Sequence, residues 1–228
     1  MSQVLGALAV LLVAFNPAFG GHKLNQRTWS TCFAWTNLKK GCTQGLAVDW
    51  YLPKADKVSH GVLKLTATKT SSNGYPYTSG MVTTYKSFHF KYGYVSIVAK
   101  LPGGNGTWPA LWLLPENQTW PPEIDIMENH GSPHQINTTL HWPTPLGDRA
   151  AATSVTTRAN LVTGYHTYGL RWTADAVTWY LDGKVVDYYS GPNVPHTPMY
   201  LLISMAIDGP AKSGSTFDIK SVRIDKNG

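Results

Sequence analysis

Apolar and polar residues alternate in many short segments along the chain, and this period of two predicts β-strands. Residues 63–68, 94–99 and 167–172 each follow the alternation. Because successive side chains of a strand point to opposite faces, every such segment has one face suited to a core and one suited to solvent. Beyond residue 20, no segment carries a sustained helical stripe of apolar residues. The pattern therefore predicts an all-β protein.

Turn residues and further apolar segments refine this architecture. Asp182 and Gly183 form a pair that favours a tight hairpin turn. The strands expected around and after this turn are 177–181, 184–189, 199–207 and 217–224. Many short strands separated by turns predict a β-jelly-roll sandwich of two antiparallel sheets, one of them curved so that its outer face forms a concave cleft.

The composition agrees with a folded chain of ordinary size. Of the 228 residues, 43% are hydrophobic and only 14% are charged, which argues against intrinsic disorder. The 21 glycines and 15 prolines interrupt the chain often, which disfavours a long helical bundle. No linker, repeat or low-complexity segment divides the chain after residue 20. We therefore predict a single domain over residues 21–228.

The first twenty residues predict a secretory signal peptide. The apolar run 4–15 is too short to span a bilayer, which needs roughly 20 residues, and Ala18 and Gly20 place small residues at a plausible cleavage site. No Lys or Arg precedes the run, and a buried or membrane-tethering segment is the alternative. We expect residues 1–20 to be removed, no stable membrane insertion, and a secreted location, either extracellular or in a periplasm or cell wall.

Cys32 and Cys42 are the only cysteines of the chain. In an exported protein, one disulfide that closes a small loop is the simplest interpretation. Two independent buried thiols are the alternative. Two cysteines do not make a zinc site.

The basic charge does not indicate a nucleic-acid partner. A net charge of +6 permits long-range attraction to anionic material. The basic residues are dispersed, however, and no recognised nucleic-acid-binding motif occurs. A solvated basic surface is the favoured interpretation, with an anionic polysaccharide or cell-surface matrix as the alternative.

The distribution of glutamate points to chemistry. The chain has only three glutamates, Glu116, Glu123 and Glu128, and the last two fall within one six-residue stretch. A role in surface solubility would scatter glutamate along the chain. The clustering indicates instead that residues 121–131, which read Pro-Pro-Glu-Ile-Asp-Ile-Met-Glu-Asn-His-Gly, carry a site.

Strand geometry places these acids on one surface. Glu123 and Asp125 share one face of a strand, and the isoleucines that follow each of them share the other, where they can fill a core. Glu128 lies at an odd offset from Glu123, so a regular strand would turn it to the core face. One extra residue at a β-bulge near Met127 would return it to the acid face. A solvated edge strand is the alternative.

Three acids in a row suit glycosidic chemistry. Like charges on one strand face repel, so such a row is expected where proximity is used. A retaining glycosidase needs a carboxylate nucleophile and a carboxylic acid about 5–5.5 Å apart. Asp125 could hydrogen-bond the nucleophile, and its charge should raise the proton affinity of its neighbours and keep Glu128 protonated.

Three tryptophans lie next to this segment. Trp108, Trp112 and Trp120 precede the acids, and exposed indole rings make good platforms for the apolar C–H faces of sugars. Core packing is the alternative for any single one. Trp112 lies inside an apolar strand and is expected in the core or on a cleft floor. Trp108 lies near a Gly-rich turn and is expected to line the cleft.

The acid row and the tryptophan block together resemble glycoside hydrolase family 16. The matching motifs are Pro-Glu-Ile-Asp-Ile-Met-Glu at 122–128, Gly-Thr-Trp-Pro-Ala-Leu-Trp-Leu-Leu-Pro at 106–115, and shorter matches at 77–81, 92–94, 100–102, 139–142 and 166–168. The resemblance runs from about residue 48 to residue 226. It implies a β-jelly roll that hydrolyses internal β-glycosidic bonds with retention.

The resemblance also implies individual roles. By motif position, Glu123 corresponds to the nucleophile, Asp125 to an assisting acid and Glu128 to the acid/base. His141 matches a cleft histidine of relatives, with a core or surface histidine as the alternative. Together with the three tryptophans it is expected to bind substrate.

The spacing Glu-x-Asp-x-x-Glu is similar to the bulged branch of the family, which holds laminarinases, agarases and carrageenases. We therefore expect a secreted, monomeric endo-β-glucanase that acts on a β-1,3-glucan or a mixed-linkage β-1,3-1,4-glucan. The alternatives are a family 16 transglycosylase, a non-catalytic carbohydrate-binding jelly roll, and an enzyme for agar, carrageenan or an acidic exopolysaccharide.

Two features depart from the pattern of many family members. Ser96 and Val98 stand where a Glu and an Arg are expected to look into the cleft, which weakens any transfer of substrate preference. Lys220 replaces an Asp of the closing strand, which makes a structural calcium site there doubtful. His130 and His134 lack metal-ligand spacing. We expect no catalytic metal and no cofactor.

Overall fold

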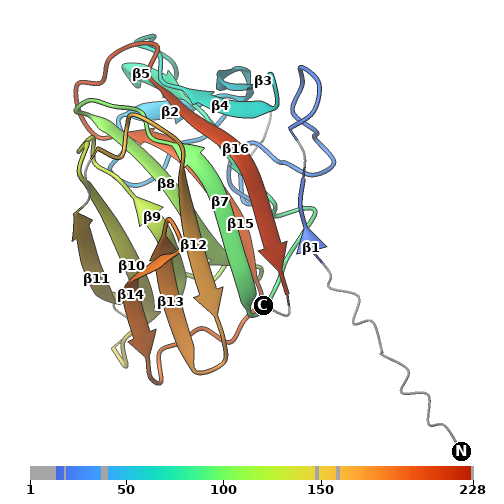
Figure 1. The fold of residues 1–228 in the computed structure, drawn as a ribbon. Coiled ribbons are helices and arrows are strands. Elements are labelled where there is room, and N and C mark those ends of the chain that lie inside the picture. The colour runs from blue at the N-terminus through green and yellow to red at the C-terminus, as the bar shows by residue number, and fades with distance from the viewer. Residues whose placement is uncertain (1–13, 18, 37–40, 147–148, 158–159, 227–228) are drawn as a thin grey trace, which may run out of the picture.

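The protein is a sandwich of two β-sheets (Figure 1). The computed structural model describes residues 14–17, 19–36, 41–146, 149–157 and 160–226. Within these ranges the only helical element is the single 3-10 turn η1 (Pro53–Ala55). No helix in this part of the chain is long and apolar enough to cross a membrane. The all-β prediction is confirmed.

The larger sheet has eight strands. In spatial order they are β14 (Lys184–Ser190), β13 (Ala176–Leu181), β12 (His166–Trp172), β7 (Gly93–Lys100), β16 (Thr216–Asp225), β4 (Val62–Thr66) and β3 (Asp56–Ser59), and β1 (Ala14–Phe15) pairs with β16. Every pairing in this sheet is antiparallel among the residues described. The predicted hairpin is present, since Leu181 pairs with Lys184 across Asp182 and Gly183, both of which have positive φ.

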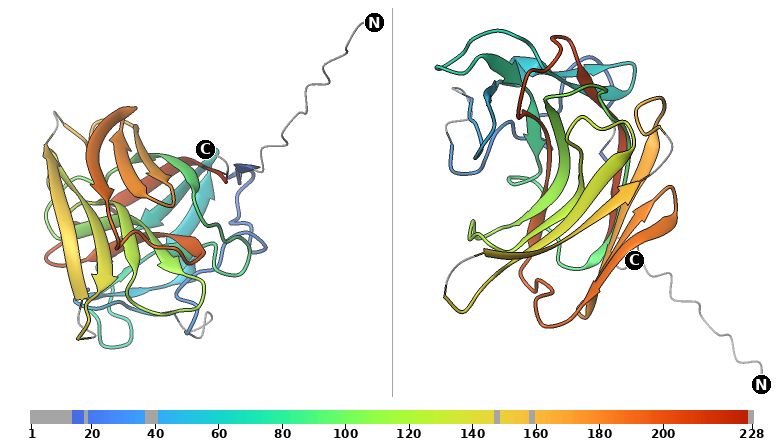
Figure 2. Two further views of the ribbon diagram at one scale, coloured as in Figure 1. Left: turned by 90° about the horizontal axis from the view of Figure 1, so that it is seen from below. Right: turned by 90° about the vertical axis from the view of Figure 1, so that its left-hand side faces the viewer.

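The second sheet has six strands and is visibly curved in the right-hand view of Figure 2. In spatial order they are β11 (Arg149–Thr157), β10 (Gln135–Pro143), β9 (Glu123–Glu128), β8 (Thr107–Pro115), β15 (Met199–Ile207) and β6 (Met81–Thr83). Two further short strands, β2 (Asp49–Tyr51) and β5 (Tyr77–Ser79), form a separate parallel pair. The acid row therefore lies on a central strand of the six-stranded sheet.

The main core fills the space between the two sheets. Strand β7 shows how it is built, because Val95, Ile97 and Ala99 are fully buried while the residues between them are partly exposed. Ile124 of β9 faces the same core from the other sheet. The alternation read from the sequence thus becomes the inner face of each sheet.

A second, smaller core covers part of the outer face of the six-stranded sheet. It contains Phe33, Trp112 and Tyr200, together with the disulfide between Cys32 and Cys42. This explains why every residue of β15 is buried, since the strand has apolar neighbours on both faces. The rest of this outer face stays open and forms the pocket described below.

The end of the predicted signal peptide packs against the sandwich. Strand β1 pairs with the end of β16, Phe15 stacks on Phe88 with ring centroids 4.3 Å apart, and Phe19 stacks on Trp29. Residues 1–13, which include most of the apolar run 4–15, lie outside the described residues, and so does residue 18 of the predicted cleavage site. Cleavage after Gly20 stays a prediction.

One expectation about the cleft is wrong. Ser96 and Val98 lie on β7, which pairs with β12 and β16 in the eight-stranded sheet. Their neighbours Val95 and Ile97 fill the core, so Ser96 and Val98 point to the outer surface on the far side from the acid row. These two positions do not look into the cleft and carry no information on its substrate preference.

Candidate active site

The predicted bulge in β9 is present. On the β8 side, Met127 pairs with Leu111 and Asp125 pairs with Trp112, so one residue of β9 between them has no counterpart. The register with β10 shifts at the same point. Because of the extra residue, Ile126 and Met127 are both buried, and Glu128 returns to the face that carries Glu123.

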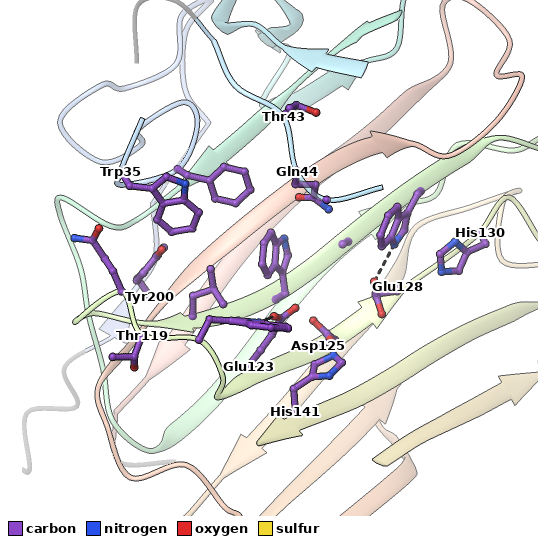
Figure 3. A pocket seen from close by; sticks show the side chains of 18 residues that line it. Trp35, Thr43, Gln44, Thr119, Glu123, Asp125, Glu128, His130, His141 and Tyr200 are labelled. Atoms are coloured by element: carbon purple, nitrogen blue, oxygen red, sulfur yellow. Dashed lines mark hydrogen bonds and ion pairs between the residues drawn. The ribbon is translucent and has the colours of Figure 1, made fainter. Parts of the chain in front are cut away.

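The acid face of β9 opens into a pocket of about 580 Å³ (Figure 3). All seven residues expected to catalyse the reaction or to bind substrate line it: Trp108, Trp112, Trp120, Glu123, Asp125, Glu128 and His141. Figure 3 shows the acids along the pocket in chain order, from Glu123 through Asp125 to Glu128. The structure therefore brings all seven side chains together in one pocket, and their roles stay predictions.

The pKa of Glu123 is strongly shifted by its surroundings. Burial raises its pKa well above the usual range, and the nearby charge of Asp125 and a side-chain hydrogen bond between the two acids raise it further. The indole Nε1 of Trp120 donates a hydrogen bond to Oε2 of Glu123, which lowers this pKa, as does the charge of His141. Asp125 therefore favours the protonated form of Glu123, whereas Trp120 and His141 favour its ionised form.

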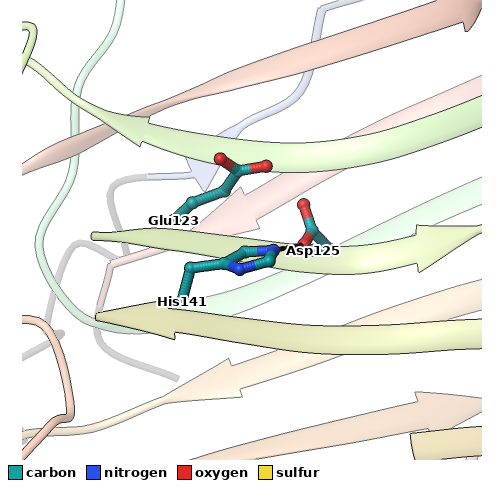
Figure 4. A group of neighbouring side chains, drawn as sticks. All are labelled: Glu123, Asp125 and His141. Atoms are coloured by element: carbon teal, nitrogen blue, oxygen red, sulfur yellow. Dashed lines mark hydrogen bonds and ion pairs between the residues drawn. The ribbon is translucent and has the colours of Figure 1, made fainter. Parts of the chain in front are cut away.

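Asp125 is the buried centre of the row. Only 2% of its surface is exposed, its Oδ2 lies 2.9 Å from Nε2 of His141, and its backbone carbonyl accepts a hydrogen bond of 2.8 Å from Nε1 of Trp179 (Figure 4). Trp179 belongs to β13 of the other sheet, so this bond ties the acid strand across the core. His141 pairs with Glu123 in the β9–β10 register, which explains how it reaches both acids.

Glu123, Asp125 and His141 are close enough to consider a metal. One ligand atom from each lies within 4.8 Å of the others. Each acid, however, already has a nitrogen partner, from Trp120 for Glu123 and from His141 for Asp125. The expectation of no metal stays a prediction.

Glu128 has a different environment at the other end of the row. Nε1 of Trp108 donates a hydrogen bond of 2.8 Å to its Oε1. The Trp108 ring packs against His130 with centroids 5.0 Å apart, and Nδ1 of His130 lies 2.8 Å from Oδ2 of Asp208. Asp208 and His130 are 78 residues apart, so no local spacing could have revealed this pair.

Sequence reasoning found part of the pocket floor but missed one wall. Trp112 lies on the floor as expected, 7% exposed, with its Nε1 hydrogen-bonded to Ser204. Tyr200 of β15 lies beside it. The remaining residues from outside the expected set come chiefly from the segment around the disulfide: Phe33, Trp35, Thr43, Gln44 and Gly45. The cysteine pair was their only sequence signal.

The disulfide itself is confirmed, since Cys32 and Cys42 are bonded. The expectation that a structural calcium site is doubtful stays a prediction. Lys220 carries its ammonium 5.6 Å from the centroid of the Tyr165 ring and offers no oxygen ligand.

Comparison with known proteins identifies the family of this chain. Residues 44–223 match the family model of the glycosyl hydrolases family 16. The chain belongs to glycoside hydrolase family 16. This family 16 chain is 36% identical over 225 residues to the endo-1,3-1,4-beta-glycanase EglC of Rhizobium meliloti (strain 1021). The alignment covers 89% of the chain and 48% of EglC, so the chain spans about half the length of curated relatives such as EglC and ExsH.

Solved structures share the fold of this family 16 chain. LamA from Zobellia galactanivorans, in complex with laminaritriose and laminaritetraose, superposes with a TM-score of 0.81 at 29% identity, over 94% of this chain and 98% of the other. The laminarinase from Flavobacterium sp. UMI-01 superposes with a TM-score of 0.79 at 29% identity, over 94% and 99%. The predicted jelly roll is therefore confirmed.

Proposed function

We propose that the protein is an endo-β-glucanase that hydrolyses internal bonds of a β-1,3-glucan or a mixed-linkage β-1,3-1,4-glucan with retention. The observation that carries the proposal is the row Glu123, Asp125 and Glu128 on one strand of an open pocket lined by tryptophans. The name of EglC and the oligosaccharides bound to LamA support a β-glucan as the substrate class.

The first chemical step uses the two ends of the row. The Glu123 carboxylate attacks the anomeric carbon of the sugar, and the Glu128 carboxylic acid gives its proton to the glycosidic oxygen. The bond between carbon and leaving oxygen breaks, the shortened chain leaves with a new hydroxyl, and the remaining sugar is held as an ester on Glu123. Asp125, hydrogen-bonded to Glu123, keeps the attacking carboxylate oriented.

The second step releases the sugar. The Glu128 carboxylate takes a proton from water, the resulting hydroxide attacks the anomeric carbon from the opposite side, and the ester bond to Glu123 breaks. Each step inverts the anomeric centre, so the product keeps the original configuration. Both glutamates return to their starting protonation states.

The electrostatics of Glu123 define the working pH. Glu123 must be ionised to attack, yet burial and the charge of Asp125 hold its pKa well above the usual range. The N–H of Trp120 and the charge of His141 oppose this shift. We therefore expect the acidic limb of the activity profile to lie above the ordinary range of a glutamate.

A direct experiment tests the proposal. Purified protein is assayed for reducing-sugar release from laminarin, lichenan, xyloglucan, agarose and carrageenan, and proton NMR reads the anomer formed first. The expected result is release from laminarin or lichenan as the β-anomer, abolished in Glu123→Gln with the circular dichroism spectrum unchanged. Glu116→Gln is the matched control, because Glu116 lies outside the pocket and interacts with His89.

Other outcomes discriminate the alternatives. Products longer than the substrate would indicate a transglycosylase, and release only from agarose or carrageenan would change the substrate class. Binding without release from any polysaccharide, or full activity of Glu123→Gln, would contradict the proposed mechanism.

We also propose that the protein is exported as a monomer with one catalytic domain over residues 21–228. The disulfide between Cys32 and Cys42 supports export, because disulfides persist in oxidising compartments. Cleavage after Gly20 would remove β1 together with its pairing to β16. N-terminal sequencing of the exported protein and size-exclusion chromatography test these points, and a mature chain that retains Phe15 would contradict the cleavage site.

A further inference from the structure

The disulfide-closed segment forms one wall of the pocket, which the acid row does not explain. Phe33 and Trp35 lie inside the loop between Cys32 and Cys42, and Thr43 and Gln44 follow it directly. The family match begins only at residue 44, so most of this wall is outside the region that defines the family. The wall is therefore a feature of this chain that its family membership does not assign.

Trp35 is the exposed member of an aromatic stack in this wall. Its ring lies parallel to that of Phe33, with centroids 4.7 Å apart and an interplanar angle of 10°. Phe33 is buried and meets the floor residue Trp112 edge-on at 6.0 Å. Trp35 itself is 58% exposed, so it contributes an indole surface to the pocket rather than to the core.

The segment that carries Trp35 is held in place from several sides. The disulfide closes it, the backbone groups of Cys42 and Tyr51 exchange two hydrogen bonds, and the Thr36 hydroxyl donates to the Phe33 carbonyl at 2.7 Å. Contacts that hold the described residues around Trp35 before binding reduce the conformational entropy that its ring loses on binding, and so favour affinity.

The position of Trp35 suits a sugar of the same polymer. In Figure 3, Trp35 and Gln44 lie on one side of the pocket, and Asp125 and His141 lie on the other. An indole face complements the apolar C–H face of a pyranose, and the polar side chains of Thr43 and Gln44 lie on the same wall, where sugar hydroxyls need partners.

We propose that Trp35 is a stacking platform for a glucosyl unit of the bound β-glucan, at a distance from the bond that is cleaved. The inference rests on the proposed function and deepens it, because it predicts that the site recognises several linked glucosyl units rather than the two sugars that flank the scissile bond. Trp35 is a binding residue and takes no part in the proton transfers.

Binding in the absence of turnover tests this. In a Glu123→Gln background, calorimetry compares laminarin and lichenan oligosaccharides of two to six units. Trp35→Ala should weaken the binding of the longest oligosaccharides about tenfold and leave the binding of the shortest ones unchanged. Trp35→Phe should restore most of the lost affinity. Tyr188→Ala is the control, since Tyr188 is 60% exposed on β14 and does not line the pocket.

The outcomes separate the two proposals. If the Glu123→Gln protein binds long oligosaccharides and Trp35→Ala binds them equally well, the platform is wrong and the proposed function stands. If the Glu123→Gln protein binds no β-glucan oligosaccharide, both proposals fail. An equal loss for short and long oligosaccharides would also overturn the platform, because it would place Trp35 at the reacting sugars.

Removal of the disulfide gives a second test of the wall. Cys32→Ala/Cys42→Ala should lose binding to the same extent as Trp35→Ala, and adding Trp35→Ala to it should cause no further loss. Full binding by the cysteine variant would contradict the bracing role of the disulfide. Circular dichroism checks whether this variant is folded. If it is unfolded, the Trp35→Ala result alone decides whether Trp35 is a stacking platform.

Discussion

The indole Nε1 of Trp108 donates a hydrogen bond of 2.8 Å to Oε1 of Glu128. Both residues come from neighbouring strands, β8 and β9, whose register places Glu128 opposite Ala110. The bulge in β9 is what turns Glu128 toward this partner. The residue expected to offer the sugar an aromatic surface therefore also orients the acid expected to protonate the leaving group.

Trp108→Phe should separate these two roles. Phenylalanine keeps an aromatic surface but has no N–H, so Glu128 loses its hydrogen bond. A hydrogen bond to an ionisable group contributes about 1.5–3 kcal/mol, and we expect kcat on laminarin or lichenan to fall about tenfold or more with a small change in KM. Trp50→Phe, outside the pocket, serves as the control. A variant that changes KM alone would show that Trp108 acts only as a sugar platform.

Asp208 should act on the same acid through His130 and Trp108. Asp208→Asn weakens the contact that holds His130 against the Trp108 ring, so we expect a fall of about two- to fivefold in kcat. The decisive measurement is a double-mutant cycle with Trp108→Phe, because residues in one chain of contacts have non-additive effects. Strictly additive losses would place Asp208 outside the group that positions Glu128.

Asp125→Asn should move the pH profile in a defined direction. The charge of Asp125 raises the pKa of Glu123, so its removal lowers that pKa, and Glu123 stays ionised to lower pH. We expect the acidic limb of kcat/KM to shift to lower pH, and kcat at the optimum to fall about tenfold because the pair with His141 is weakened. A limb that stays in place or moves to higher pH would contradict this electrostatic coupling.

Asp49 should make stability depend on pH. Burial raises its pKa to about 6, while hydrogen bonds from Ser79 and the Ile207 N–H partly oppose the shift. Because the folded-state pKa is the higher one, the folded protein binds the proton more tightly. The contribution of Asp49 to the free energy of unfolding therefore falls as pH rises, by about 3 kcal/mol in total at roughly 1.4 kcal/mol per pKa unit, and by about 2 kcal/mol between pH 4 and pH 7.

Asp49→Asn tests this sign, because asparagine has nearly the same shape and does not ionise. Urea unfolding is measured for both proteins at pH 4 and pH 7. The free energy of unfolding of the variant, relative to the unmodified protein, should rise by about 2 kcal/mol between these values. Other titrating groups cancel in the comparison. A difference that is constant or falls with pH would show that Asp49 is ionised in the folded protein.

Much of the site was predictable because it is local in the chain. Side-chain alternation places Glu123 and Asp125 on one face, and the odd offset of Glu128 requires a bulge near Met127, which is where the register shifts. Cys32 and Cys42 are the only cysteines of a chain expected to be exported, which allowed the disulfide to be predicted from the sequence. Each of these inferences needs only the geometry of one short segment.

Other features depend on contacts that no single segment contains. Alternation shows that Ser96 and Val98 share a face, but the pairing of β7 with β12 and β16 decides that this face is the outer surface of the eight-stranded sheet. In the same way, the Asp208–His130 pair exists because the packing of the six-stranded sheet brings together segments distant in the chain.

The sequence by itself determined the strands, the acid row and the chemistry that such a row can perform, because strand periodicity and residue type act over a few positions. Only the tertiary structure decided which sheet each strand joins, which donor each acid receives and that Trp35 lies in the wall of the pocket. The physical reason is that strand pairing and close packing join residues from distant segments, and their partners are fixed only when the whole sandwich forms.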